Sequence, residues 1–224
     1  MPKLSSRGKT LRPEDFKYYL NDIVNLGCYK AINRAGSTED EVDAFYTGFL
    51  ADVFLKKNGW VIHAQTRAGR TLVKVDVRVR WVSLQGAQTA VILWENKRRE
   101  LESDSSVWAE ALEQVVEYAD AVRCNGPEQD ASKPLYLTVN VGTYLRFYEL
   151  PGLSNVAKDW APAKGKLYEL ADDEEAVWKL WNRLREVDET TSAVRLVESH
   201  ISKMKDGWLN KLDADSVATR KETP

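Results

Sequence analysis

The sequence is poor in the residues that build disulfides and zinc sites. Its 224 residues include only two cysteines, Cys28 and Cys124, and two histidines, His63 and His200, which stand far apart in the chain. A scaffold held by disulfides is therefore excluded, and a zinc site lacks enough of its usual ligands. The low cysteine content favours a reducing, intracellular setting, in the cytoplasm or the nucleus.

Long apolar segments are also absent. No run approaches the roughly 18 apolar residues of a membrane-spanning helix, so we expect no contact with a membrane. The N-terminus carries charges but no apolar segment of the kind found in secretory signals, so we expect that the protein is not secreted. The net charge of −2 gives no chain-wide basic signal for nucleic acid, so charge distribution has to be read locally.

The periodicity of the apolar residues predicts an α/β fold. Helical spacing predicts one helix from Pro13 to just before Gly36 and a second from Ser37 or Thr38 to about Phe54. Farther along, we expect strands at 60–65, 72–82 and 90–97, a helix at 106–122, a hairpin of strands at 135–141 and 144–150, and two C-terminal helices around 177–187 and 194–204.

This pattern divides the chain into five parts. They are a basic arm with an N-terminal helix (1–36), a core (37–151), a loop (152–171), C-terminal helices that pack on the core (172–212) and a flexible tail (213–224). The apolar stripes of the C-terminal helices must be buried, so a homodimer or a partner protein at these helices is an alternative to packing on the core.

The strand expected at 72–82 carries an acid on its polar side. Four valines point one way, and the residues between them point the other: Lys74, Asp76, Arg78 and Arg80. Glu95 and Lys97 stand two residues apart at the end of the next strand, so they project on the same side. Neighbouring strands bring Asp76 and Glu95 within a few ångström, where two carboxylates repel each other unless they share a cation.

A divalent cation suits these oxygen ligands. We expect Mg²⁺ or Mn²⁺ at Asp76 and Glu95, with the carbonyl of Asn96 as a further ligand. Such an ion activates a bound water for phosphodiester hydrolysis, and Lys97 stands where it can orient that water or stabilise the developing charge. The alternative is that Asp76 pairs with its basic neighbours on a solvated strand, and that Glu95 and Lys97 only mark a strand end.

The order of these elements resembles the PD-(D/E)xK nuclease superfamily. Val75-Asp76-Val77 and Trp94-Glu95-Asn96-Lys97 match its two motif elements, with valine in place of the proline. Residues 111–119 resemble the QxxxY element of the RecB-like branch and of the N-terminal nuclease domain of type I restriction motor subunits. The resemblance covers residues 38–150 and implies a restriction-endonuclease-like core with a central mixed β-sheet flanked by helices, to which N- and C-terminal helices are added.

The resemblance also implies roles for residues outside the two motif elements. Gln114 faces the site, and Tyr118 supports the site or contacts nucleic acid. An acid on the first core helix approaches the metal; Glu41 is the candidate, with Glu39 second, and the alternative for Glu41 is a capping residue. We expect the basic side chains near the site to hold phosphates, namely those of Lys74, Arg98 and Arg99.

Together these features predict a metal-dependent nuclease that acts on DNA. The sequence leaves one alternative open, a catalytically inactive nuclease-fold module that binds nucleic acid or a protein partner. Affinity for Mg²⁺ discriminates between the two, because a pure binding module has no need of the ion.

Overall fold

A computed structural model describes residues 11–68, 72–82, 88–125 and 131–186. The chain divides into two units, Met1–Leu184 and Arg185–Pro224, and the account below concerns the first. The basic arm up to residue 10, the helix expected at 194–204 and the tail at 213–224 lie outside the described residues.

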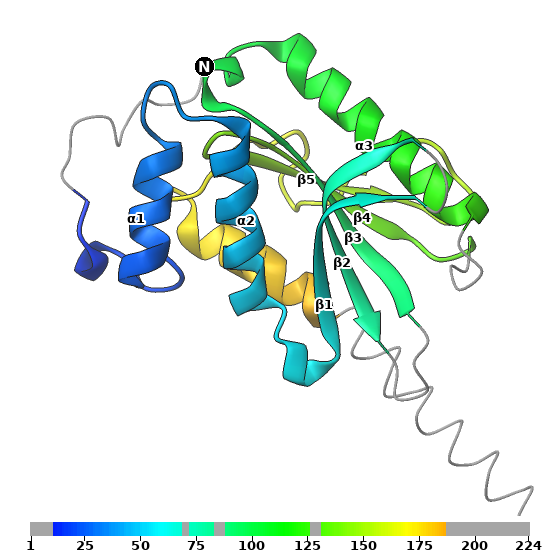
Figure 1. The fold of residues 1–224 in the computed structure, drawn as a ribbon, viewed down its shortest axis with the longest axis horizontal. Helices are drawn as coiled ribbons and strands as arrows, with labels where there is room; N and C mark the ends of the chain where they lie inside the picture. The colour runs from blue at the N-terminus through cyan, green and yellow to red at the C-terminus, as the bar shows by residue number, and fades with distance from the viewer. Residues whose placement is uncertain (1–10, 69–71, 83–87, 126–130, 187–224) are drawn as a thin grey trace, which may run out of the picture. The chain divides into compact units, whose positions relative to one another are not determined.

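A mixed sheet forms the centre of this unit (Figure 1). The described strands are β1 (Trp60–Arg67), β2 (Lys74–Val82), β3 (Gln88–Lys97), β4 (Leu135–Val141), β5 (Tyr144–Leu150), β6 (Lys158–Asp159) and β7 (Tyr168–Glu169). β1 to β6 are neighbours in chain order, and β7 also pairs with β5. The β3–β4 pair is parallel and the other pairs are antiparallel. This confirms the predicted α/β class, and the mixed sheet is compatible with a restriction-endonuclease-like core.

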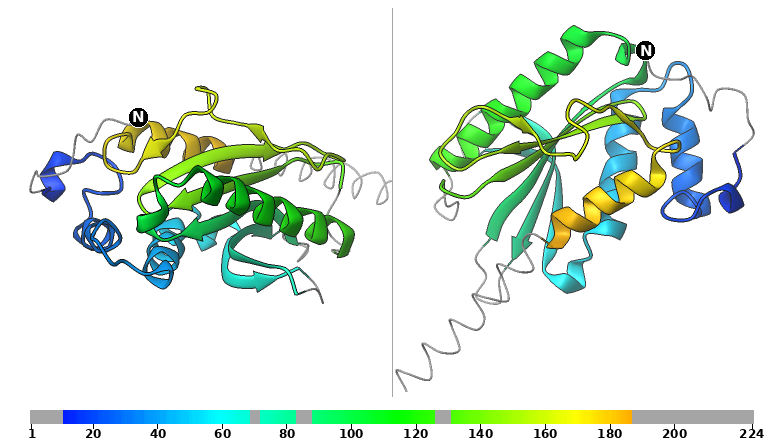
Figure 2. Two further views of the ribbon diagram at one scale, coloured as in Figure 1. Left: turned by 90° about the horizontal axis from the view of Figure 1, so that it is seen from above. Right: turned by 180° about the vertical axis from the view of Figure 1, so that it is seen from behind.

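Helices cover both faces of the sheet, as predicted (Figure 2). On one face lie α1 (Ile23–Ile32), α2 (Glu39–Val53) and the helical residues 174–184. Trp181 from the last of these packs against Phe49 of α2 and Trp94 of β3, with ring centroids 4.5 and 6.3 Å apart. On the other face, α3 (Ser105–Asn125) packs through Val115 and its apolar neighbours on Leu93 and β4.

The N-terminal helix is shorter than predicted. Pro13–Asp15 forms only a 3-10 turn, η1, and α1 begins at Ile23, where the Asp22 side chain accepts the N–H groups of residues 24 and 25. The buried carboxylate of Glu174 explains the difference, because it accepts the backbone N–H groups of residues 17, 18 and 20. These bonds hold the intervening segment in a non-helical path and bury Tyr19 and Leu20.

The segment at 152–171, expected to be a loop, contributes the short strands β6 and β7. Both pair with β5, which would otherwise be the edge strand of the sheet. Trp160, next to β6, packs edge-on against Tyr136 with ring centroids 5.3 Å apart. The two short strands therefore cover the edge of β5, for which the sequence pattern predicted no further neighbour.

The hairpin between β4 and β5 turns tightly beside the end of β3. Gly142 has a φ of +59°, and its N–H donates to the Lys97 carbonyl at 2.8 Å. A Cβ at this position would lie 2.8 Å from the Cα of Arg99, so glycine is required for both its conformation and its size. Among the described residues, no helix is both long and apolar enough to cross a membrane.

Candidate active site

Five of the predicted site residues lie around one open pocket of about 460 Å³. Its walls come from β1, β2, β3 and α3, together with the residues just before β2. The lining residues are Gln65, Leu72, Val73, Lys74, Asp76, Glu95, Lys97, Gln114 and Glu117. The structure thus brings together Asp76, Glu95, Lys97, Gln114 and Lys74, which come from three separate elements.

Asp76 is fixed by bonds to both neighbouring strands. Its Oδ2 accepts the backbone N–H of Asn96 at 2.7 Å, and its Oδ1 accepts from Nε2 of Gln65 at 3.0 Å. Burial raises the pKa of Asp76 despite these bonds, because the low-dielectric surroundings disfavour the charged form. The carboxylate is therefore held in place, but these bonds and the charge of Lys97 compensate its burial only in part.

Glu95 and Lys97 form an ion pair within β3. Lys97 Nζ lies 2.7 Å from Glu95 Oε1. The side chain of Lys97 is 16% exposed and that of Glu95 is 8% exposed. Burial and the charge of Asp76 raise the pKa of Glu95 to about 7. Burial alone would lower the pKa of Lys97, but the hydrogen bond that Lys97 donates to Glu95 and the negative charge of Glu95 raise it, so Lys97 stays charged at neutral pH.

The acid that α2 brings to this region is Asp43. Asp43 Oδ2 accepts from Gln65 Nε2 at 2.7 Å, and its Oδ1 accepts from Asn96 Nδ2 at 2.9 Å. Burial and the charge of Asp76 raise its pKa to about 6. This residue was not among the predicted site residues. The available signal was its position between Val42 and Tyr46, at the margin of the buried stripe of α2.

Glu41 is placed elsewhere, which corrects its assignment to the site. Its side chain accepts the backbone N–H of Thr38 at 2.9 Å and forms an ion pair with Arg34. Glu41 is therefore the capping residue that the sequence offered as the alternative. Glu39, the second candidate, is exposed, and its charge contributes to the raised pKa values of Asp76 and Glu95.

Asn96 connects the acids to the core. Its side chain is fully buried on the α2 side, where its Oδ1 accepts from Asn140 Nδ2 at 2.8 Å while its Nδ2 donates to Asp43. Its backbone N–H donates to Asp76. A role for its carbonyl as a metal ligand stays a prediction.

Gln65 was not predicted and is marked by its backbone. It has a φ of +49°, in the left-handed region that residues other than glycine rarely adopt. From this conformation one amide nitrogen reaches both Asp43 and Asp76. Strain of this kind persists where surrounding contacts enforce it and is frequent at functional sites. No sequence pattern identifies such a residue.

The remaining predicted residues differ in their accessibility. Tyr118 is fully buried with its hydroxyl 3.3 Å from Thr66 Oγ1, so of its two expected roles it can support the site but cannot contact nucleic acid directly. Arg99 binds the Asn33 carbonyl and lies 3.8 Å from Glu102, so its guanidinium is engaged within the fold rather than held out for phosphates. Arg98 and Lys74 are exposed.

The pocket offers two carboxylates that could serve as ligands of Mg²⁺ or Mn²⁺. Asp76 and Glu95 supply carboxylate oxygens, and Mg²⁺ is commonly held by one or two carboxylates together with waters and substrate phosphates. Across the described residues, no group of three or more His, Cys, Asp or Glu side chains is gathered closely enough to hold a metal ion. The chain alone therefore offers a partial coordination shell, which solvent and substrate would have to complete.

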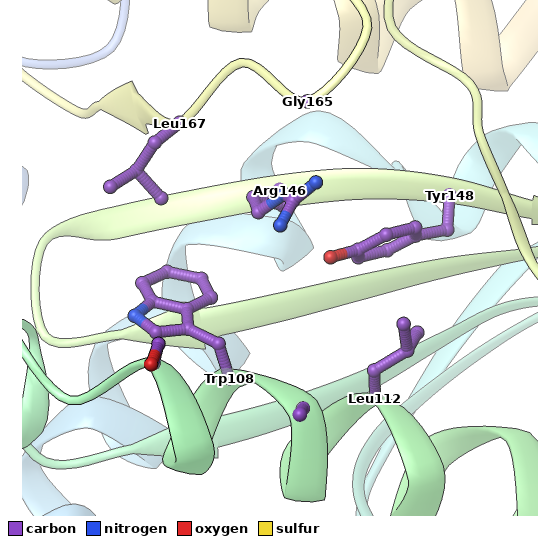
Figure 3. A pocket seen from close by; sticks show the side chains of 8 residues that line it. Trp108, Leu112, Arg146, Tyr148, Gly165 and Leu167 are labelled. Carbon is purple, nitrogen blue, oxygen red and sulfur yellow. The ribbon is translucent and has the colours of Figure 1, made fainter.

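A second pocket, of about 340 Å³, lies between α3 and β5 (Figure 3). Trp108, Leu112, Arg146, Tyr148 and Leu167 line most of it, and no lining residue is an acid. Arg146 is engaged there, 3.2 Å from Asp159 and stacked on the Tyr148 ring at 5.2 Å. The carboxylate chemistry needed for a metal site therefore belongs to the pocket at Asp76.

No family model and no curated protein matches this chain. Among solved structures, a cryo-electron microscopy structure of a DrdV–DNA complex is similar, with 15% sequence identity and a TM-score of 0.38. The match covers 70% of this chain and 13% of that one, so this chain spans about an eighth of its length. A likeness this weak carries no argument about the site.

Proposed function

We propose that this chain is a metal-dependent nuclease that hydrolyses phosphodiester bonds of DNA. The observation that carries the proposal is the placement of Asp76, Glu95 and Lys97 on neighbouring strands around one open pocket. Asp76 is partly buried and Glu95 is buried, and two such carboxylates with raised pKa values are unfavourable next to each other unless a cation reduces their repulsion. Clustered acids of this kind, lining a pocket beside a charged lysine, are typical of catalytic sites.

Each residue has a distinct task in this proposal. Asp76 and Glu95 would hold Mg²⁺ or Mn²⁺, which when bound lowers the pKa of a water and offsets charge on the phosphate. Lys97 uses one of its three N–H donors on Glu95, so two remain for a water or a phosphate oxygen. Asp43 and Gln65 keep Asp76 in position through the shared amide nitrogen.

The charges that line the pocket and its openness to solvent favour a phosphodiester as substrate. A phosphodiester is an anion that approaches a pocket lined by acids, so it needs cations nearby. Lys97 lies at the base of the pocket and Lys74 at its rim, while Gln114 adds an uncharged amide to the wall on α3. This arrangement suits a phosphate flanked by bases and sugars better than a small free acid, because the pocket is open.

Cleavage of DNA tests the proposal. Supercoiled circular DNA and linear DNA, single- and double-stranded, would be incubated with the protein in Mg²⁺, Mn²⁺ or EDTA, beside the Asp76→Ala and Lys97→Ala variants. We expect cleavage that needs the metal and that falls at least about 100-fold in each variant. Products from the circular form indicate an endonuclease, and degradation of linear DNA alone indicates an exonuclease.

Two outcomes would overturn the proposal. One is an absence of cleavage by the unmodified protein in every metal, and the other is cleavage that persists in both variants. Binding of DNA without cleavage and without affinity for Mg²⁺ would instead establish the alternative, a nuclease-fold module that binds nucleic acid.

A further inference from the structure

The polar side of β2 continues past the pocket as a row of basic residues. Arg78 and Arg80 follow Asp76 at intervals of two residues, so all three side chains project on one side of the strand. The register of the neighbouring strand places His63 of β1 directly opposite Arg78. On the other side of Asp76, Lys74 lies at the rim of the pocket. The acid of the site therefore stands in the middle of a line of cations.

The basic residues are in contact and partly buried. Arg80 Nη2 lies 2.6 Å from His63 Nε2, so the imidazole accepts a hydrogen bond from the guanidinium. Arg78, Arg80 and His63 each keep part of their surface exposed. The Nε atom of Arg78 is buried and has no hydrogen-bond partner among the described residues. Arg78 therefore has a nitrogen donor that the described fold leaves unused.

Arg78 and Arg80, two residues apart on β2, carry charges of the same sign. Burial, followed by the charges of Arg80 and Arg78, lowers the pKa of His63, which keeps the imidazole neutral. In the described part of the chain, Arg78 forms no ion pair with a carboxylate. Placing a partly desolvated guanidinium beside another cation without an acid is costly, and an anionic ligand would offset that cost.

We propose that Arg78, Arg80 and His63 form a track that binds the phosphates of the DNA strand next to the scissile bond. The proposal rests on the function proposed above and assigns the path of the substrate. The reacting phosphate lies over Asp76, one flank of the strand runs past Lys74, and the other runs along Arg78 and Arg80. Alternate residues of a strand are spaced about 7 Å apart, so the row presents repeated charges to a repeated anion instead of one charge to a single small anion.

Electrostatics explains why such a track is needed. Asp76, Glu95 and Asp43 together repel a polyanion, and the two lysines of the pocket do not outnumber them. Cations on both sides of the acids attract the strand without occupying the place of the metal. The planar guanidinium of Arg78 can donate two parallel hydrogen bonds to a phosphate, which fixes the strand more firmly than a lysine would, and Arg80 adds positive charge next to it.

Binding of DNA without cleavage tests the track separately from the chemistry. Anisotropy of a short fluorescein-labelled DNA duplex would be measured in EDTA, with the double variant Arg78→Gln/Arg80→Gln against the unmodified protein. The matched control is Lys30→Gln/Lys164→Gln, which removes two exposed charges from α1 and from the loop before β7. We expect Kd to rise at least about 10-fold in the arginine variant only, and the slope of log Kd against log salt to fall by about 1 to 2.

Cleavage kinetics in Mg²⁺ separate this proposal from the nuclease proposal. If the protein cleaves DNA, the arginine variant is expected to raise KM with little change in kcat. Unchanged Kd and KM in that variant, or equal losses in the lysine control, would overturn the track and leave the nuclease standing. An arginine-dependent Kd in a protein that never cleaves would support the track and overturn the nuclease.

Thermal melting followed by circular dichroism shows whether the double variant is folded. If it is not, Arg78→Gln alone replaces it, with Arg78→Lys as the variant that keeps the charge. The track then predicts weaker binding for Arg78→Gln than for Arg78→Lys, and equal binding by the two would overturn it.

Discussion

Asp76 Oδ2 accepts the backbone N–H of Asn96 at 2.7 Å, so the first acid of the pocket is tied to the strand that carries the second. Asn96 lies between Glu95 and Lys97, and any movement of Asp76 relative to those two residues would break this bond. The geometry of the site is therefore built into the β2–β3 strand pair. A short chain of hydrogen bonds through Asn96 and Asp43 extends it to α2.

The contributions of Glu95 and Lys97 to the free energy of unfolding should depend strongly on each other. Lys97→Met leaves the buried Glu95 without its donor and is expected to lower the free energy of unfolding by about 1–3 kcal/mol. Glu95→Gln/Lys97→Met removes both charges and should cost less than the sum of the two single changes. Urea unfolding at pH 7 without metal measures all four proteins. Additive losses would show that the two side chains do not depend on each other.

Substitutions of Asp43 and Glu41 should distinguish a residue that cleavage requires from a residue that only caps α2. Asp43→Asn keeps the shape but removes the charge near Asp76, and we expect about a 10- to 100-fold loss of cleavage rate. Glu41→Ala should leave the rate nearly unchanged and lower the stability slightly, because it breaks the capping box of α2. Cleavage rates and unfolding curves of both variants check this, and the reverse pattern would return Glu41 to the site.

Replacing glycine by alanine should destabilise the protein at one position and stabilise it at another. Gly142→Ala forces a side chain into a left-handed turn and against Arg99 and Glu102, so we expect a loss of about 1–3 kcal/mol. Gly48→Ala, in α2, meets no atom within 4 Å and is expected to gain up to about 1 kcal/mol. Thermal unfolding of the two variants tests this. A neutral result for Gly142→Ala would mean that the β4–β5 turn is more tolerant than described.

Stability should depend on pH through Glu169, which accepts from the Tyr29 hydroxyl at 2.8 Å. Burial raises the pKa of Glu169 above its unfolded value, so the folded state binds the proton more tightly. Its contribution to stability is therefore fully present below the unfolded pKa and is lost as pH rises through the folded pKa.

Replacing this carboxyl provides the measurement for that prediction. Glu169→Gln cannot titrate, so the stability of the unmodified protein relative to the variant should fall as the pH rises above about 4.5. Urea unfolding of both proteins at several pH values measures the difference. A difference that grows with pH would contradict the prediction.

The sequence predicted the strands of the site well, because their signals are local. The alternation of valines with charged residues fixed β2 and the direction of Asp76, and the apolar run before Glu95 fixed β3. In the structure Val75, Val77 and Val79 are buried, while the side chains between them reach the surface in part. Side-chain alternation follows from strand geometry alone, so it needs no tertiary information.

Features set by distant partners could not be predicted. The path of residues 16–22 depends on Glu174, which lies more than 150 positions away in the chain. Asp43 and Glu41 stand two residues apart on one helix, and only the position of α2 against β1 and β3 decides which acid reaches the pocket. Gln65 was missed, and Arg99 was expected to hold phosphates, for the same reason: their contacts join separate elements.

The most direct test of the account is the initial rate of supercoiled DNA cleavage in Mg²⁺ for three proteins prepared in parallel: unmodified, Asp76→Ala and Asp40→Ala. Asp40 is an exposed acid in the first turn of α2 and serves as the matched control. The account predicts equal rates for the unmodified protein and Asp40→Ala, and a loss of at least about 100-fold for Asp76→Ala. Equal rates in all three proteins, or no cleavage by any of them, would contradict it.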